Sequence, residues 1–169
     1  MKLLVCISKV PDTTSKINFV ENNTKFDESG VQYIVNPYDE WYALVRALEL
    51  VEKHGGTVTT ITVGTNADDP TIRKALAIGA NDAVRIDANP SDPYFVAKQI
   101  ADYAANESFD VILTGKETIN YNGSQIGGMV AELLDMPFVS LGTKLNIEGN
   151  TATLERDVQG GIEVIEVST

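Results

Sequence analysis

Residues 110–134 read DVILTGKETINYNGSQIGGMVAELL. The first five, Asp110 to Thr114, are mostly apolar and predict a buried strand. A polar loop containing glycine follows them. Beyond the loop, apolar residues recur at the spacing of a helical face: Ile126, Met129, Val130 and Leu133. Pro137 is predicted to end that helix. A buried strand that leads through a polar loop into an amphipathic helix indicates one βα unit of a parallel sheet.

The same unit recurs on both sides of this stretch. The other strands are expected at Lys2 to Ser8, Thr57 to Val63, Ala83 to Ile86 and Phe138 to Leu141. The other helices are expected to open at Asn36-Pro37, Asp69-Pro70 and Asp92-Pro93, because Asn and Asp favour the N-cap and Pro the first helical position. Five such strands predict an α/β fold: a Rossmann-like parallel sheet with helices on both faces.

Two segments depart from this alternation. Before the first helix lies a long polar excursion, in which we expect a small hairpin around Lys16 to Phe26 and a short extended segment at Val31 to Val35. After Thr143 the pattern predicts antiparallel strands joined by glycine turns: Lys144 to Ile147, Thr151 to Arg156 and Glu163 to Val167. We expect residues 1–169 to form a single nucleotide-binding domain, with residues 144–169 as an antiparallel strand extension.

Composition narrows the classes of partner. The 169 residues carry a net charge of −11, which disfavours nucleic acid and anionic membranes. A single cysteine, Cys6, excludes an internal disulfide and a Cys-rich metal site. The apolar run near the N-terminus is too short for a signal-peptide core or a membrane span. We therefore expect a soluble, cytoplasmic protein without membrane insertion.

The candidate ligand site follows from the sheet. In open α/β sheets, ligands bind beyond the carboxyl ends of the strands. The loops expected there are Ser8 to Thr14, Asn36 to Tyr38, Gly64 to Asp68 and Gly115 to Ser124. In the last loop, Gly123 allows close approach to a ligand, Ser124 and Gln125 add side-chain donors, and the free N–H groups of the following helix favour a phosphate. The alternative is that Asn122 caps the helix and the glycines serve packing.

Several familiar sites are missing. The sequence has neither a G-x-x-x-x-G-K-[ST] loop nor G-x-G-x-x-G after its first strand, which argues against a P-loop NTPase or an ordinary nicotinamide dehydrogenase. No catalytic constellation is apparent. Cys6 is interpreted as core, although its place near the end of a strand would suit contact with a bound ring. Trp41 is interpreted as core, and Lys116 and Glu117 as solvated loop charges.

Five segments, taken in order, resemble the electron-transfer flavoprotein β-subunit family over essentially the whole chain. They are KLLVCISKVPDT (2–13), VNPYDEWYALVRALEL (35–50), ALAIGANDAVRID (75–87), GKETINYNGSQIGGMVAELLDMPFVS (115–140) and ERDVQGGIEVIEVS (155–168). The resemblance implies an adenine nucleotide alpha hydrolase-like fold and an electron carrier without substrate turnover of its own. Family members continue into a C-terminal arm, so the resemblance implies a C-terminally truncated chain.

The resemblance also implies cofactors and partners. The partner is an electron-transfer flavoprotein α subunit, which shares an FAD with this chain, and dehydrogenases are the electron donors. This chain would hold AMP, or a second FAD. The implied nucleotide contacts are Cys6, Asn36, Val63, Tyr121, Asn122, Gly123, Ser124, Gln125 and Ile126, and Thr13 matches a position that approaches the partner's flavin.

The 115–125 loop departs from the family pattern. Glu117 replaces a Gln, Asn120 replaces an Asp, and Tyr121 and Asn122 stand where acids are common. A less acidic loop repels a phosphate less. Both AMP and FAD stay open as the nucleotide of this chain, and AMP is the favoured one. Two other classes of nucleotide-binding protein fit the residues less well. A universal-stress-protein module lacks its G-x-x-G and later G-[ST] pattern here. A pyrophosphatase-type ligase lacks its glycine-rich loop after the first strand.

Overall fold

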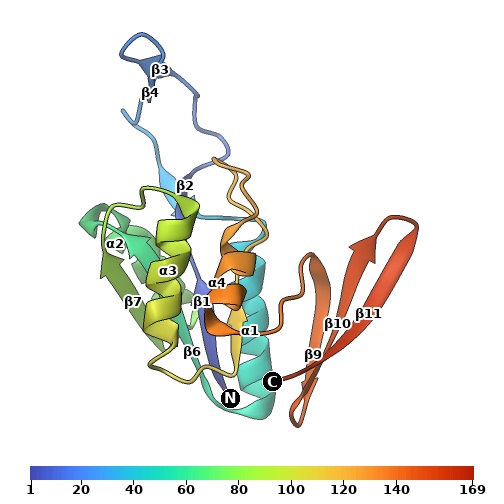
Figure 1. Cartoon of the computed structure of the whole chain (residues 1–169). Coiled ribbons are helices and arrows are strands. Elements are labelled where there is room, and N and C mark those ends of the chain that lie inside the picture. The colour runs from blue at the N-terminus through green and yellow to red at the C-terminus, as the bar shows by residue number, and fades with distance from the viewer.

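The computed structural model describes all residues from 1 to 169. Its centre is a four-stranded parallel sheet in the order β7-β6-β1-β8 (Figure 1). The strands are β1 (Lys2–Cys6), β6 (Thr57–Gly64), β7 (Asp82–Asp87) and β8 (Val111–Leu113). The central strand β1 is almost wholly buried, as its uninterrupted apolar run predicts. The α/β class expected from the sequence is confirmed.

Helices cover both faces of this sheet. The side chains of β1 alternate between two cores, because successive residues of a strand point to opposite faces. Leu3 and Val5 pack in a core with α1 (Glu40–His54) and α2 (Asp69–Ile78). Leu4 packs in a second core with α3 (Pro93–Ala104) and α4 (Ile126–Leu134). A short 3₁₀ turn, η1 (Asn66–Asp68), precedes α2.

The excursion after β1 contains two small ribbons. In the first, β2 (Lys9–Pro11) pairs antiparallel with β5 (Tyr33–Val35). In the second, β3 (Phe19–Val20) pairs with β4 (Lys25–Phe26), and this hairpin projects away from the body of the molecule (Figure 1). The expected hairpin and the expected extended segment are both confirmed.

The C-terminal part forms a three-stranded antiparallel sheet, as expected. Its strands are β9 (Gly142–Glu148), β10 (Thr151–Val158) and β11 (Gly161–Ser168), with β10 in the middle. Leu145, Ile147 and Ala152 join the core on the α1 side. The Arg46 guanidinium on α1 donates to the Leu145 carbonyl from Nε at 3.1 Å and from Nη2 at 2.5 Å. These contacts attach the antiparallel sheet to α1.

The expected strand at Phe138 to Leu141 is wrong, and the parallel sheet has four strands instead of five. Asp135 ends α4 in the left-handed conformation, and Leu141 also has a positive φ of 56°, which breaks an extended run. The ring of Phe138 instead packs against the helix at Gly127, where a Cβ would lie 3.1 Å from it. The apolar residue that suggested a strand therefore packs against a helix instead of pairing in the sheet.

The expected start of the first helix is also wrong. The helix α1 begins at Glu40, not at Pro37, and the Asn36 side chain bonds elsewhere instead of capping it. The buried face of α1 consists of Glu40, Leu44, Ala47 and Leu50. Trp41 lies off this face and is 40% exposed, so its assignment to the core is wrong. None of the helices combines the length and the apolar character that crossing a membrane would require.

Candidate functional site

The loops that follow β1, β6 and β8 leave the same end of the parallel sheet, and α1 begins there as well (Figure 1). Parallel strands place their carboxyl ends together, so this convergence follows from the fold. The residues expected to bind a ligand are distributed over these loops. The longest of them joins β8 to α4 and spans residues 114–125.

Asn36 and Asp39 hold the β8–α4 loop at Glu117. The Asn36 side chain is fully buried, and its Nδ2 donates to the Glu117 carbonyl at 2.7 Å. The Glu117 N–H donates to Asp39 Oδ2 at 3.0 Å. Gly115 permits this approach, because a Cβ there would lie 2.8 Å from the Glu40 side chain and 2.9 Å from Asp39. Two polar contacts thus fix the backbone of Glu117 on both sides.

The other amide atom of Asn36, Oδ1, is buried and has no hydrogen-bond partner. A buried acceptor without a donor costs about 1–3 kcal/mol, so such atoms in native proteins call for an explanation. The bond to Glu117 holds the amide at the carboxyl end of the parallel sheet. A bound molecule that offers an N–H or O–H group would satisfy Oδ1.

Glu40 ties the end of β1 to the start of α1. Its carboxylate accepts hydrogen bonds from the Ser8 N–H and the Ser8 hydroxyl, both at 2.7 Å. The residue is only 6% exposed, and this burial raises the pKa of Glu40 to about 8. Glu40 is not among the site residues predicted from the sequence. Its spacing to Leu44 and Ala47, four and seven residues on, is the signal that predicts a buried position.

The Glu117 side chain lies within the loop rather than free in solvent. It pairs with Lys116 at 2.9 Å and accepts from the Ser124 hydroxyl at 3.0 Å. The Lys116 ammonium and the Ser124 hydroxyl, with a smaller contribution from the Asn122 side chain, hold the pKa of Glu117 below its usual range. The Lys116 side chain is 46% exposed and the Glu117 side chain 24%. The interpretation as a solvated loop charge therefore suits Lys116 better than Glu117.

The segment from Tyr121 to Gln125 is exposed along its length. Asn122 and Ser124 adopt left-handed backbone conformations, with φ of 51° and 50°, and Gly123 between them has open space beside its Cα. Gln125 is the N-cap of α4 but makes no capping bond through its side chain. The N–H groups of the first helical turn have no partner within the helix, so this end of α4 presents donors.

The remaining expected contacts lie outside residues 114–125. Cys6 is the last residue of β1 and is buried; desolvation raises the pKa of its thiol to about 12, and the Glu40 carboxylate adds to the effect. Val63 is half-buried near the end of β6, Ile126 is half-buried at the start of α4, and Thr13 is exposed beyond β2. Hydrogen bonds therefore unite Asn36 with the loop and with Ser124 through Glu117, but they do not reach Thr13 or Val63.

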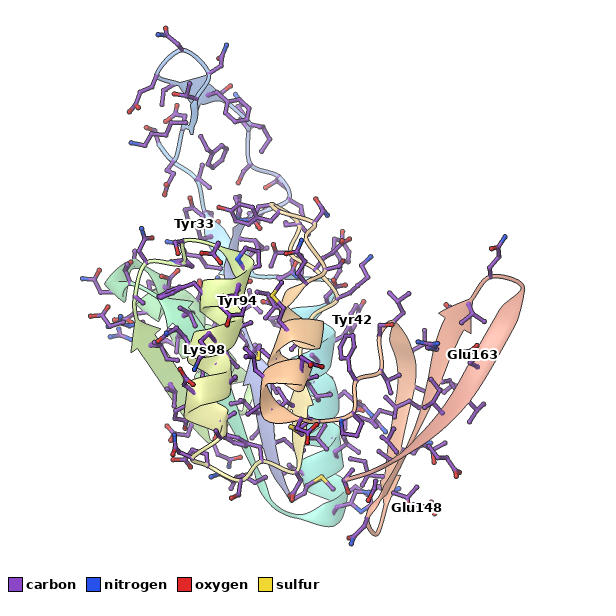
Figure 2. All side chains as sticks on the ribbon, viewed as in Figure 1. Tyr33, Tyr42, Tyr94, Lys98, Glu148 and Glu163 are labelled. Atoms are coloured by element: carbon purple, nitrogen blue, oxygen red, sulfur yellow. The ribbon has the colours of Figure 1, made fainter.

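A cavity of about 1240 Å³ lies next to β8, the edge strand of the parallel sheet. Its walls are α1, β8, α4 and residues 136–146, and among the loop residues it reaches Gly115, Lys116, Glu117 and Ser124. Figure 2 shows Tyr42 of α1 directed into the space beside the antiparallel sheet. Neither Cys6 nor Asn36 lines this cavity. No group of three or more His, Cys, Asp and Glu side chains is arranged to hold a metal ion.

Comparison with known proteins gives consistent matches. The electron transfer flavoprotein domain matches residues 23–169. The electron transfer flavoprotein subunit beta of Bacillus subtilis is 40% identical over 172 residues, which cover 99% of this chain and 66% of that protein. The mitochondrial beta subunit of Oryza sativa subsp. japonica is 35% identical, with 99% and 68% covered. Protein FixA of Azorhizobium caulinodans is 33% identical, with 98% and 62% covered. The chain thus spans about two thirds of the length of these relatives.

Proposed function

This chain belongs to the electron transfer flavoprotein beta-subunit family, and on that premise we propose that it is an electron-carrier subunit that binds an adenine nucleotide and transforms no substrate of its own. Residues 1–169 act as one nucleotide-binding unit. The partner is an alpha-type subunit with which the chain shares an FAD, and dehydrogenases supply the electrons. The cytoplasm is the proposed location.

The observation that carries the nucleotide proposal is the unpartnered Oδ1 of Asn36. It is fully buried, it is fixed by the bond from Nδ2 to Glu117, and it is an acceptor. An adenosine has both amino and hydroxyl donors, either of which would satisfy it. Because no donor within the protein bonds to Oδ1, a bound ligand explains the burial of this atom better than packing does.

Separate observations support a binding site for the phosphate of the nucleotide at the start of α4. The first turn of α4 offers free N–H groups and the positive end of the helix dipole. Ser124 and Gln125 stand beside that turn with side-chain donors, and Gly123 leaves room for close approach. We propose that these residues hold the phosphate while Asn36 contacts the nucleoside. Cys6, Val63, Tyr121, Asn122 and Ile126 complete the proposed contacts, and Thr13 is proposed to approach the shared flavin.

The chain then contributes to electron transfer by positioning the bound nucleotide. The redox chemistry belongs to the flavin when it is bound. The residues around Asn36 and Glu117 position a nucleotide, which binds the folded chain only and therefore stabilises it. We propose AMP in preference to a second FAD for this place.

The first experiment identifies the nucleotide. The protein is purified under native conditions and denatured, and the released small molecules are identified by mass; AMP is expected. A nucleotide-free sample is then titrated with AMP, ADP and FAD in a thermal-shift assay. A ligand at 100 times its Kd adds about 2.7 kcal/mol of stability, which is a readily measured shift. The absence of any shift with all three nucleotides contradicts the proposal.

A variant tests whether the start of α4 binds the nucleotide. Gln125→Ala is expected to lower nucleotide retention without changing the fold, because it removes a donor at the start of the helix. Gln159→Ala, in the exposed turn between β10 and β11, is the matched control and keeps wild-type retention. Equal nucleotide content in both variants contradicts the role of Gln125.

A further inference from the structure

The Glu117 carboxylate occupies a donor that the proposed phosphate site needs. Ser124 Oγ donates to Glu117 Oε2 at 3.0 Å. Ser124 belongs to the segment before α4 that is proposed to receive the nucleotide. A carboxylate and a phosphate oxygen are both anionic acceptors, so they compete for the same hydroxyl and amide donors.

This carboxylate is anchored at its own backbone. The Glu117 carbonyl accepts from buried Asn36 Nδ2 at 2.7 Å, and its N–H donates to Asp39 Oδ2 at 3.0 Å. Lys116 Nζ lies 2.9 Å from its other oxygen. The backbone of Glu117 is thus fixed on both sides, and Lys116 and Ser124 hold its side chain. The negative charge therefore lies close to the segment that leads into α4.

We propose that Glu117 is a specificity-determining residue, an internal anion that competes with nucleotide phosphate and biases the site toward ligands of low phosphate charge. The inference rests on the proposed function, and it concerns which nucleotide that site retains. Repulsion between like charges rises with the charge of the ligand. AMP is therefore disfavoured less than ADP, and adenosine, which has no phosphate, is unaffected.

The ionisation of Glu117 supports this competition over a wide range of pH. The Lys116 ammonium and the Ser124 hydroxyl hold the pKa of this carboxylate below its usual range. The group is therefore charged under ordinary conditions. Asn36 Oδ1, which is proposed to contact the nucleoside, has no hydrogen-bond partner and is therefore not engaged by Glu117.

The test compares three ligands on the wild type and three variants. Adenosine, AMP and ADP are titrated by calorimetry into the nucleotide-free wild type, Glu117→Gln and Glu117→Ala. Glu132→Gln, on the exposed end of α4, is the control for loss of one negative charge. Glu117→Gln is expected to tighten AMP binding about tenfold and ADP binding by more, and to leave adenosine unchanged. Glu117→Ala is expected to give at least the same gain.

A double-mutant cycle locates the effect. Ser124→Ala is expected to weaken AMP binding less in the wild type than in the Glu117→Gln background, because Glu117 competes for the hydroxyl in the wild type. In the Glu117→Gln background the same change is expected to remove most of the gain in AMP affinity, because Ser124 then serves the phosphate. Additive effects of the two substitutions contradict competition for this donor.

The other outcomes separate the two proposals. Equal AMP affinities in wild type and both Glu117 variants overturn the role of Glu117 and leave nucleotide binding intact. Weaker binding of all three ligands, adenosine included, also overturns it and makes Glu117 a ribose ligand or a loop anchor. Absence of binding in every protein, with unfolding temperatures showing that each is folded, overturns the proposed function and this inference together.

Discussion

The Asn36 side-chain amide donates a 2.7 Å hydrogen bond to the carbonyl of Glu117, a residue 81 positions further along the chain. One bond therefore joins the segment before the first helix of the fold to the loop before the last. The other amide atom, Oδ1, is buried and has no hydrogen-bond partner within the protein. The geometry of the candidate site depends on this long-range contact.

Replacing Asn36 tests that contact directly. Asn36→Ala leaves the part-buried Glu117 carbonyl without its donor, which is expected to lower the free energy of unfolding by about 1–3 kcal/mol. Denaturant unfolding of the nucleotide-free protein measures it. Asn106→Ala is the matched control, because Asn106 makes the same kind of bond, to the Asp102 carbonyl at 2.8 Å, at an exposed position. A loss no larger than that of the control would show that the Asn36 bond does not hold the loop.

The stability of the protein is expected to depend on pH through Glu40. Its pKa rises from 4.5 to about 8 in the folded protein, chiefly because the carboxyl is buried. Below pH 4.5 the carboxyl is protonated in both states. Between pH 4.5 and 8 the unfolded chain releases the proton while the folded protein keeps it, so the stability contributed by Glu40 falls as pH rises.

Glu40→Gln isolates that effect. The neutral amide retains an acceptor for Ser8 and has no proton to release. The difference in unfolding free energy between wild type and Glu40→Gln is expected to move in favour of the variant by a few kcal/mol from pH 5 to pH 8, since one pKa unit corresponds to about 1.4 kcal/mol. Denaturant curves at several pH values measure it. A difference that stays constant with pH would mean that Glu40 is ionised in the folded protein.

Two adjacent glycines of α4 are expected to respond in opposite ways to alanine. At Gly127 a Cβ would lie 2.7 Å from Thr114 Oγ1 and 3.1 Å from the Phe138 ring, so Gly127→Ala is expected to destabilise the protein by about 1–3 kcal/mol. At Gly128 the nearest atom would be 3.6 Å away, an ordinary contact. Gly128→Ala is expected to stabilise by up to about 1 kcal/mol through helix propensity. Thermal unfolding measures both, and equal effects would contradict the packing of Phe138 described above.

The Cys6 thiol is expected to be inert in the folded protein. Burial raises its pKa to about 12, so almost none is thiolate at pH 8, and the thiolate is the reactive form. Treatment with iodoacetamide at pH 8 should leave Cys6 unmodified by mass, whereas the same treatment in denaturant should modify it completely. Rapid modification of the native protein would place the thiol in an accessible position.

The alternation of apolar runs, turn residues and helical faces was enough to predict the parallel sheet, its two helical layers and the antiparallel strands at the C-terminus. These features depend on local periodicity and on burial, which a sequence records directly. The same information predicted which loops lie at the carboxyl end of the parallel sheet. It also gave the family resemblance that the comparisons confirm.

Periodicity did not predict what depends on contacts between distant residues. Phe138 belongs to an apolar run that suits a strand, but its ring packs against the glycines of α4 instead. Asn36 suits a helix cap, but its amide is engaged by Glu117. Glu117 looks like a solvated charge, but a hydroxyl seven residues away binds it. In each case two local structures were physically acceptable, and the partner brought in by the tertiary fold selected between them.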